Sequence, residues 1–258
     1  MNFSQMPLKR KIRRIGFRII RWSKLPFILP DWFSFAKKLS DRFPMRLADA
    51  YPCIGDKTAG TKFERHYVYH TAWAARVVKE INPKFHTDIS SSLYFCGVAS
   101  AFVPIKFYDY RPAALHLSGL ESEHADLMHL PFGNKSINSI SCMHTLEHIG
   151  LGRYGDPIDP DGDIKAIKEL KRVTAQDGNL LLVMPVGKPR IEYNAHRIYS
   201  YEMVKKIVCD EEFYIHEYTY IPQFEEEGPM VRNADPKSGD SASYACGCFW
   251  IKRRTQPL

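Results

Sequence analysis

Apolar residues recur at two different spacings along this chain, and the change falls near residue 85. Residues 61–81 carry apolar side chains three and four positions apart, including Val77 and Val78, which predicts a helix that ends at Asn82-Pro83. Beyond it, short apolar runs typical of buried strands alternate with segments of helical periodicity. Alternation of this kind predicts an α/β fold, with a parallel sheet covered by helices.

The predicted elements after residue 85 follow one another closely. In chain order they are a strand at 87–89, a helix at 91–101, strands at 103–108 and 137–143, a helix at 164–174, a strand at 179–184, a helix at 201–209, and strands at 213–221 and 243–253. A polar, acidic loop joins the last two strands without a crossover helix, so we expect that pair to be antiparallel.

The composition indicates one globular domain preceded by N-terminal segments. With 258 residues, 45% of them apolar, the chain is long enough to bury a substantial core. We assign residues 61–258 to this domain and residues 26–60 to a linker or cap that is rich in proline and aromatic residues. Residues 1–25 form a separate basic, amphipathic segment.

The positive charge of the chain is concentrated at its N-terminus. The formal net charge is +7, residues 1–24 contribute +8 without any acidic residue, and the remainder is therefore −1. A nucleic-acid enzyme more often spreads basic residues around its binding groove, so we expect no nucleic-acid partner.

The N-terminal segment allows two interpretations. On a helical wheel, residues 8–25 place Leu8, Ile12 and Ile19 on one side and basic residues on the rest. Such a helix can bind an anionic membrane surface, or its apolar side can pack on the domain or on a partner. No run of eighteen apolar residues, no secretory signal pattern and no C-x-x-C spacing is present, which favours a cytoplasmic protein. Membrane association through this segment stays one of the two interpretations.

Aspartates follow several predicted strands. Asp88 and Asp109 close the first two strands, and Asp126 begins the run D-L-M-H-L-P-F. The ligand site of an open α/β sheet lies at these strand ends. The order of the motifs D-x-x-x-L-P-F, L-E-H and E-L-x-R-V, followed by a strand entered through a glycine, resembles the class I S-adenosylmethionine (SAM)-dependent methyltransferases over roughly residues 85–220.

A longer sequence motif points to one particular family within this class. The residues E-H-I-G-L-G-R-Y-G-D-P at 147–157, together with N-A-H-R at 194–197, resemble an uncharacterised methyltransferase-like family, a domain of unknown function. The resemblance implies a Rossmann-like class I methyltransferase fold: a mostly parallel sheet with a final antiparallel strand and helices on both faces. It brings no assigned substrate, and we expect a small-molecule or glycan-type acceptor.

The resemblance also implies S-adenosyl-L-methionine as the cofactor. Asp109 would accept hydrogen bonds from both ribose hydroxyls, because a carboxylate offers only acceptors. Asp126 would lie near the adenine amino group with the backbone N–H of Leu127 beside it, and Asp88 would hold the methionyl ammonium directly or through water. Each aspartate could instead be a turn or cap residue.

The turn after the first strand departs from the class. A glycine-rich turn usually lets the backbone approach the cofactor here, whereas this chain has Asp88-Ile-Ser-Ser-Ser92. We expect the hydroxyls of Ser90 and Ser92 to contribute to cofactor binding. The alternative is a catalytically silent methyltransferase-like module that serves as a binding or scaffold protein.

Histidines supply candidate chemistry on the acceptor side. His144, Glu147, His148 and His196 are expected near the methyl end of the cofactor, where one of them could act as a base or orient the acceptor, or they could satisfy loop backbone groups. His144-x-x-Glu147-His148 also matches the H-x-x-E-H pattern of inverted zinc peptidases, but that pattern needs a helix, which Gly150 would end at once. We therefore expect no metal site.

Overall fold

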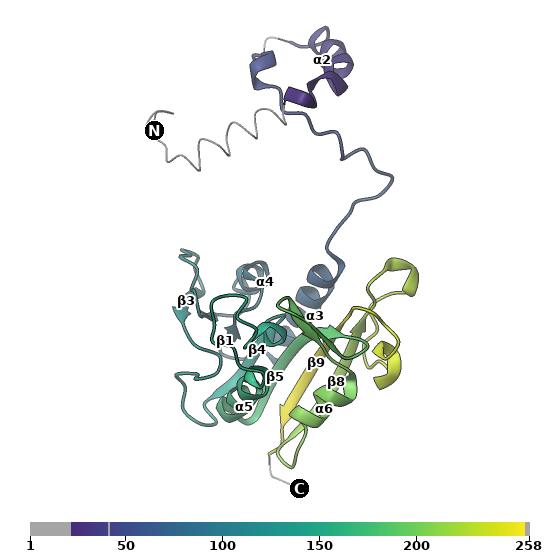
Figure 1. Cartoon of the computed structure of the whole chain (residues 1–258). Coiled ribbons are helices and arrows are strands. Elements are labelled where there is room, and N and C mark those ends of the chain that lie inside the picture. The colour runs from purple at the N-terminus through teal and green to yellow at the C-terminus, as the bar shows by residue number, and fades with distance from the viewer. Residues whose placement is uncertain (1–21, 41, 256–258) are drawn as a thin grey trace. The chain divides into compact units, whose positions relative to one another are not determined.

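The computed structural model describes residues 22–40 and 42–255, and the chain divides into two compact units, residues 1–62 and 63–258 (Figure 1). The N-terminal unit contains helix α2 (Leu29–Ala36), flanked by the 3₁₀ turns η2 (Leu25–Phe27) and η3 (Leu47–Asp49). The stretch predicted as a proline-rich linker or cap thus contains a helix. Pro30 lies in the first turn of α2, where the missing N–H of proline has no intrahelical partner to lose.

The predicted basic segment, residues 1–25, lies almost entirely outside the described residues. Within the described part of the chain, no helix is both long enough and apolar enough to cross a membrane. All six cysteines are free thiols.

The C-terminal unit is built on one sheet of seven strands. Their order across the sheet is β3-β2-β1-β4-β5-β9-β8. Their bounds are β1 (His86–Ile89), β2 (Ile105–Asp109), β3 (Leu120–His124), β4 (Ile137–Met143), β5 (Thr174–Val186), β8 (Phe213–Ile221) and β9 (Ala245–Arg253). Strands β1 to β5 run parallel to one another, whereas β9 runs antiparallel to both β5 and β8. The predicted mostly parallel sheet with a reversed final strand is confirmed.

Four helices cover this sheet: α3 (Arg65–Ile81), α4 (Leu93–Ala99), α5 (Gly162–Val173) and α6 (Tyr201–Val208) (Figure 1). Strand β5 shows how they divide between the two faces, because alternate side chains of a strand point to opposite sides. Leu180 and Leu182 belong to the core formed with α5 and α6, and Leu181 and Val183 belong to the core formed with α3 and α4. The sheet is therefore buried on both faces, as the Rossmann-like fold requires.

The predicted elements agree with the structure except at the polar segments. Strands β4 and β8 have the predicted bounds, and α3, α5 and α6 match the predicted helices within a few residues at their ends. Helix α4 is shorter than predicted and β5 is longer. Three strands were not predicted: β3, with the sequence Leu-Glu-Ser-Glu-His, and the hairpin of β6 (Arg190–Glu192) and β7 (His196–Ile198), because polar residues conceal the strand pattern.

Candidate active site

A cavity of about 240 Å³ opens at the carboxyl ends of the parallel strands. Its wall comes from the segments that follow β1, β2 and β3 and from the loop at 144–157, which follows β4. The lining residues are Ser90, Asp109, Tyr110, Arg111, Ala125, Asp126, Leu127, Met128, His144, Thr145, His148, Ile149, Tyr154, Asp156 and Pro157. A ligand site is expected at this edge of an open α/β sheet.

Asp109 and Asp126 stand at the ends of two neighbouring strands and both line this cavity. Asp109 is the last residue of β2, and one of its carboxylate oxygens accepts a hydrogen bond of 2.7 Å from the backbone N–H of Arg111. Asp126 follows β3 and accepts a bond of 2.9 Å from the backbone N–H of Met128. Each carboxylate thus keeps an oxygen with further acceptor capacity, and each is held in place by its own turn.

The serine turn has one member in the cavity wall. Ser90 adopts a left-handed backbone conformation with φ of +57°, a region that favours glycine. Its backbone N–H donates to the Tyr108 carbonyl at 2.7 Å, and its own carbonyl accepts from the Thr145 hydroxyl at 2.9 Å. Ser92, the residue before α4, is half-buried and is not part of the cavity lining.

Asp88 lies beneath this turn and does not line the cavity. Its side chain is fully buried and accepts hydrogen bonds from the Ser91 backbone N–H, at 3.0 Å, and from the Ser141 hydroxyl. The Ser141 hydroxyl also lies 2.9 Å from Nε2 of buried His86. Burial raises the pKa of Asp88 to about 6, although the serine hydrogen bonds oppose the shift. Asp88 is thus placed to fix the turn rather than to touch a ligand in this cavity.

His148 presents one ring nitrogen without a strong partner. Its Nδ1 lies 2.6 Å from the Ala195 carbonyl oxygen, so Nδ1 carries the proton and donates. Nε2 then holds the lone pair, and its nearest carboxylate oxygen, Glu147 Oε1, lies 3.9 Å away. Burial lowers the pKa of His148 despite the nearby Glu147 carboxylate. The ring is therefore neutral at neutral pH and can accept a proton.

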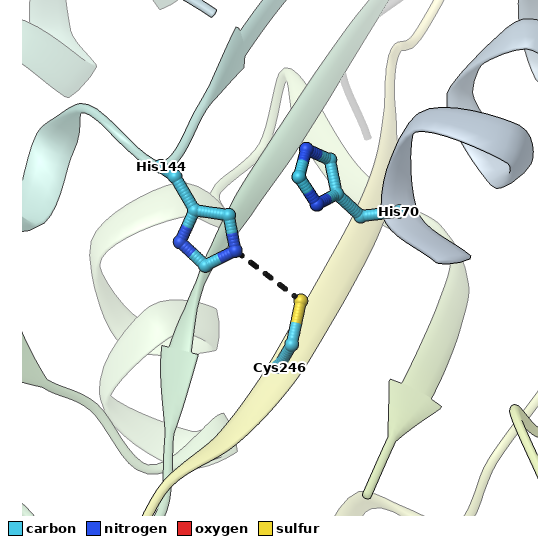
Figure 2. A group of neighbouring side chains, drawn as sticks. All are labelled: His70, His144 and Cys246. Carbon is cyan, nitrogen blue, oxygen red and sulfur yellow. Dashed lines mark hydrogen bonds between the residues drawn. The ribbon is translucent and has the colours of Figure 1, made fainter. Parts of the chain in front are cut away.

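His144 and Glu147 form a second, deeper group. His144 also has a positive φ, +54°, and its Nδ1 lies 2.9 Å from Glu147 Oε1. On its other side, Nε2 lies 3.6 Å from Sγ of Cys246 (Figure 2). Burial lowers the pKa of His144, but its contacts with Cys246 and Glu147 outweigh this effect and raise it. The pKa of the Cys246 thiol is lowered, because its contacts with Cys248 and His144 outweigh its burial.

His196 lies beside the cavity lining rather than in it. It begins β7, and its Nε2 lies 3.1 Å from Glu192 Oε2 across the hairpin. Its ring centroid is 6.3 Å from that of His148 and 5.2 Å from that of Tyr244. Of the four predicted acceptor-side residues, His144 and His148 line the cavity, and Glu147 is buried behind them.

The loop after β4 closes tightly around Gly150. Residues Leu146–His148 form a single 3₁₀ turn, so His144 and His148 do not share the face of an α-helix as the inverted zinc peptidase pattern requires. Gly150 has φ of +78°, and a Cβ there would lie 2.0 Å from the Asp159 carbonyl oxygen. Its backbone N–H donates to Asp156 Oδ2 at 2.8 Å, which fixes the part of the loop that lines the cavity.

Sequence reasoning missed several residues around the site. Tyr110, Arg111 and Tyr154 line the cavity, with the Arg111 guanidinium 5.0 Å from the centre of the Tyr154 ring. His70 and Cys246 stand next to His144 and come from α3 and β9. One signal was available: His66 and His70 are four residues apart in the predicted helix and therefore share a face.

Comparison with known proteins connects this chain to an uncharacterised family. Residues 126–228 match the family model described as "Caenorhabditis protein of unknown function, DUF268". The match confirms the resemblance to an uncharacterised domain family and carries no assigned activity. No curated protein matches the sequence.

Several of the solved structures that resemble this chain are described as methyltransferases. A SAM-dependent methyltransferase from Aquifex aeolicus is 14% identical, with 69% of this chain and 88% of that chain covered and a TM-score of 0.42. A putative sarcosine dimethylglycine methyltransferase from Galdieria sulphuraria is 11% identical, with 73% and 86% covered and a TM-score of 0.47. A putative methyltransferase from Bacillus halodurans is 14% identical, with 72% and 100% covered and a TM-score of 0.43. The likeness concerns fold and says nothing of substrate.

Proposed function

We propose that this protein binds S-adenosyl-L-methionine in the cavity at the ends of β1 to β4 and transfers its methyl group to a small-molecule or glycan-type acceptor. The observation that carries the proposal is the placement of Asp109 and Asp126 in one cavity wall, at the ends of adjacent strands. Two carboxylates in that position can accept from the ribose hydroxyls and from the adenine amino group of one extended nucleoside.

The protein's part in methyl transfer is mainly placement. The nucleophile must be held in line with the sulfonium methyl, and a hydroxyl acceptor also needs a base. We assign the base role to His148, whose Nε2 is unprotonated and whose ring lines the cavity. His144 suits the role less well, because both of its ring nitrogens already have partners in Glu147 and Cys246.

Replacement of Asp109 by alanine tests the cofactor site. Calorimetric titration with SAM and S-adenosylhomocysteine should show binding to the parent protein and weakening by at least about tenfold in Asp109→Ala, since a hydrogen bond to a charged group contributes roughly 1.5–3 kcal/mol. The matched control is Glu123→Ala, an exposed carboxylate on β3 that does not line the cavity. Equal SAM affinity in Asp109→Ala and the parent would refute this assignment.

Replacement of His148 by glutamine tests the catalytic step separately. With an acceptor in hand, His148→Gln should bind SAM like the parent and methylate the acceptor about 10² to 10⁴ times more slowly, the usual contribution of a positioned base. Radiolabelled methyl incorporation would measure the rate. An unchanged rate would remove His148 from the chemistry without affecting the cofactor proposal.

A catalytically silent module is the second candidate, and Ser90 is the observation that favours it. Ser90 lines the cavity, and its backbone adopts a conformation that favours glycine, while its hydroxyl donates to the Tyr108 carbonyl at 3.4 Å. Titration of Ser90→Gly with SAM separates the candidates. Tighter binding in the variant would indicate an obstructed, degenerate pocket, whereas weaker binding would mean that the hydroxyl belongs to a working site.

We further propose cytoplasmic placement with attachment to anionic membrane surfaces through residues 8–25. The support is the sequence itself, which combines an apolar stripe with eight basic residues and no acidic residue in residues 1–24.

A further inference from the structure

Three side chains from distant parts of the chain converge behind the cavity. His70 comes from α3, His144 from the end of β4 and Cys246 from β9 (Figure 2). One potential ligand atom of each, a ring nitrogen or the sulfur, lies within 4.8 Å of the other two. We call these three residues the His-Cys cluster. None of its members is adjacent to another in sequence, so the fold alone assembles it.

Each of the two histidines has one ring nitrogen that faces the cluster. Nδ1 of His70 lies 2.7 Å from the His66 carbonyl oxygen and donates to it, so the lone pair is on Nε2. That Nε2 is buried and has no hydrogen-bond partner among the described residues. Nδ1 of His144 is held by Glu147 Oε1 at 2.9 Å, which directs Nε2 of His144 toward the Cys246 sulfur at 3.6 Å.

This is the arrangement found around protein metal ions. A histidine that binds a metal through one nitrogen almost always donates its other N–H to a carboxylate or a backbone carbonyl. In the His-Cys cluster, Glu147 is the carboxylate and His66 provides the carbonyl. Side chains of all three cluster residues are at least nine-tenths buried. An unpartnered ring nitrogen in such surroundings is costly unless something binds it.

We propose that His70, His144 and Cys246 bind a divalent zinc ion. Two imidazole nitrogens and one thiolate are typical zinc ligands, and zinc bonds of about 2.0–2.3 Å place tetrahedral ligand atoms roughly 3.3–3.8 Å apart. The atoms of the cluster therefore need to approach by about 1 Å. Three protein ligands leave one position open, as in catalytic rather than structural zinc sites.

The ion would bind beside the proposed cofactor cavity, because His144 belongs to both the cluster and the cavity wall. The proposal does not depend on methyl transfer, since zinc uptake can be measured without SAM. The competing arrangement is a bare pair of Cys246 thiolate and His144 imidazolium. That pair would leave Nε2 of His70 without a partner, which is why we favour the metal ion.

Cobalt substitution tests the site in the full-length protein. Chelator-treated protein is titrated with Co²⁺ and then with Zn²⁺. We expect one ion per chain, the strong visible absorption of tetrahedral cobalt and a near-ultraviolet charge-transfer band from a thiolate ligand. Zn²⁺ should abolish both signals by displacement. A folded parent protein that shows no thiolate–cobalt band would overturn the proposal.

Three variants locate the ligands. Cys246→Ser should lose the charge-transfer band and weaken zinc binding by more than about 100-fold, whereas Glu147→Gln should keep the band and weaken binding by about 10- to 100-fold, as for other outer-shell partners. The control is Cys142→Ser, which alters an equally buried cysteine on β4 outside the cluster and should bind like the parent. Persistence of the band in Cys246→Ser would contradict the assignment.

Two further measurements keep the test decisive if Cys246→Ser does not fold. His70→Gln should keep the thiolate band but weaken zinc binding, since it removes one nitrogen ligand and leaves the sulfur. Excess Zn²⁺ should raise the thermal unfolding midpoint of the parent protein, because an ion that binds only the folded state stabilises it. A midpoint that Zn²⁺ leaves unchanged would support the bare thiolate–imidazolium pair and overturn the metal site.

Discussion

Asp88 is the residue whose structural role differs most from the role implied by resemblance. It is the next-to-last residue of β1, where a carboxylate that holds the methionyl ammonium is expected, yet its side chain is fully buried and bonded to Ser91 and Ser141. A direct contact with the ammonium would require the turn above it to move. The property of Asp88 that can be tested from this structure is its contribution to the free energy of unfolding.

The Asp88 carboxyl should make the protein less stable as the pH rises from about 4 to 6. Its pKa is raised by burial from 3.8 to about 6, so in this range the folded state holds a proton that the unfolded state has lost. Proton release on unfolding then favours unfolding at higher pH. Asp88→Asn lacks this effect, so the stability of the variant relative to the parent should increase across the range by on the order of 3 kcal/mol.

Urea unfolding at several pH values measures this difference. The variant must be compared with the parent because buried His86 changes the free energy of unfolding with pH in the opposite direction. Burial lowers the pKa of His86 to about 3, so acid favours the unfolded state, in which this histidine is protonated. Asp161→Asn, at an exposed carboxyl, is the control. If the difference in free energy of unfolding between Asp88→Asn and the parent stays constant from pH 4 to 7, Asp88 ionises normally.

At the scale of elements, the turn from β1 to α4 places a serine where the backbone conformation favours glycine. Ser90 sits at φ of +57°, which costs a residue with a Cβ about 1–2 kcal/mol, whereas Ser92 at φ of −66° is unstrained and makes no side-chain capping bond. Ser90→Gly should therefore be more stable than Ser92→Gly by about 1 kcal/mol in urea unfolding, since both variants add the same freedom to the unfolded chain. Equal stability of the two variants would mean that the turn is relaxed.

The sequence predicted those elements in which one periodicity dominates. Strands β4 and β8 and helix α6 are clear because their apolar residues face a core at regular spacing. Strand β3 escaped prediction because it pairs only with β2 at the edge of the sheet and buries only Leu120. The ends of β2 and β4 could be predicted from sequence order alone, and with them Asp109 and His144.

The His-Cys cluster could not be predicted in the same way. Its members come from α3, the end of β4 and β9, so no local spacing connects them. What brings them together is the topology: β9 lies next to β5 inside the sheet, and α3 packs on the face that carries Cys246. The expectation of no metal site rested on local spacing, which does not register residues brought together by long-range pairing, and it stays a prediction for the zinc titration to test.

At the scale of the whole molecule, the proposed cofactor binding and the proposed surface attachment concern different parts of the chain. The C-terminal unit contains the sheet, the two cores and the cavity, whereas the segment with eight basic residues and no acidic residue is residues 1–24. A segment of that charge bound at a membrane gains about 1 kcal/mol for each basic residue near the anionic surface. The attachment should therefore depend strongly on salt.

Deletion of residues 1–25 should abolish co-sedimentation with vesicles that contain phosphatidylserine and leave SAM binding unchanged. The full-length protein should sediment with these vesicles at low salt, detach as salt increases, and bind neutral phosphatidylcholine vesicles weakly, because screening and lipid charge both act on the same electrostatic attraction. Sedimentation assays on the two forms, with calorimetric SAM titration alongside, measure both properties. If the deletion form sediments like the full chain, the apolar stripe of residues 8–25 packs on protein instead. If the deletion removes SAM binding as well, the N-terminal segment belongs to the cofactor site and the division of labour proposed here is wrong.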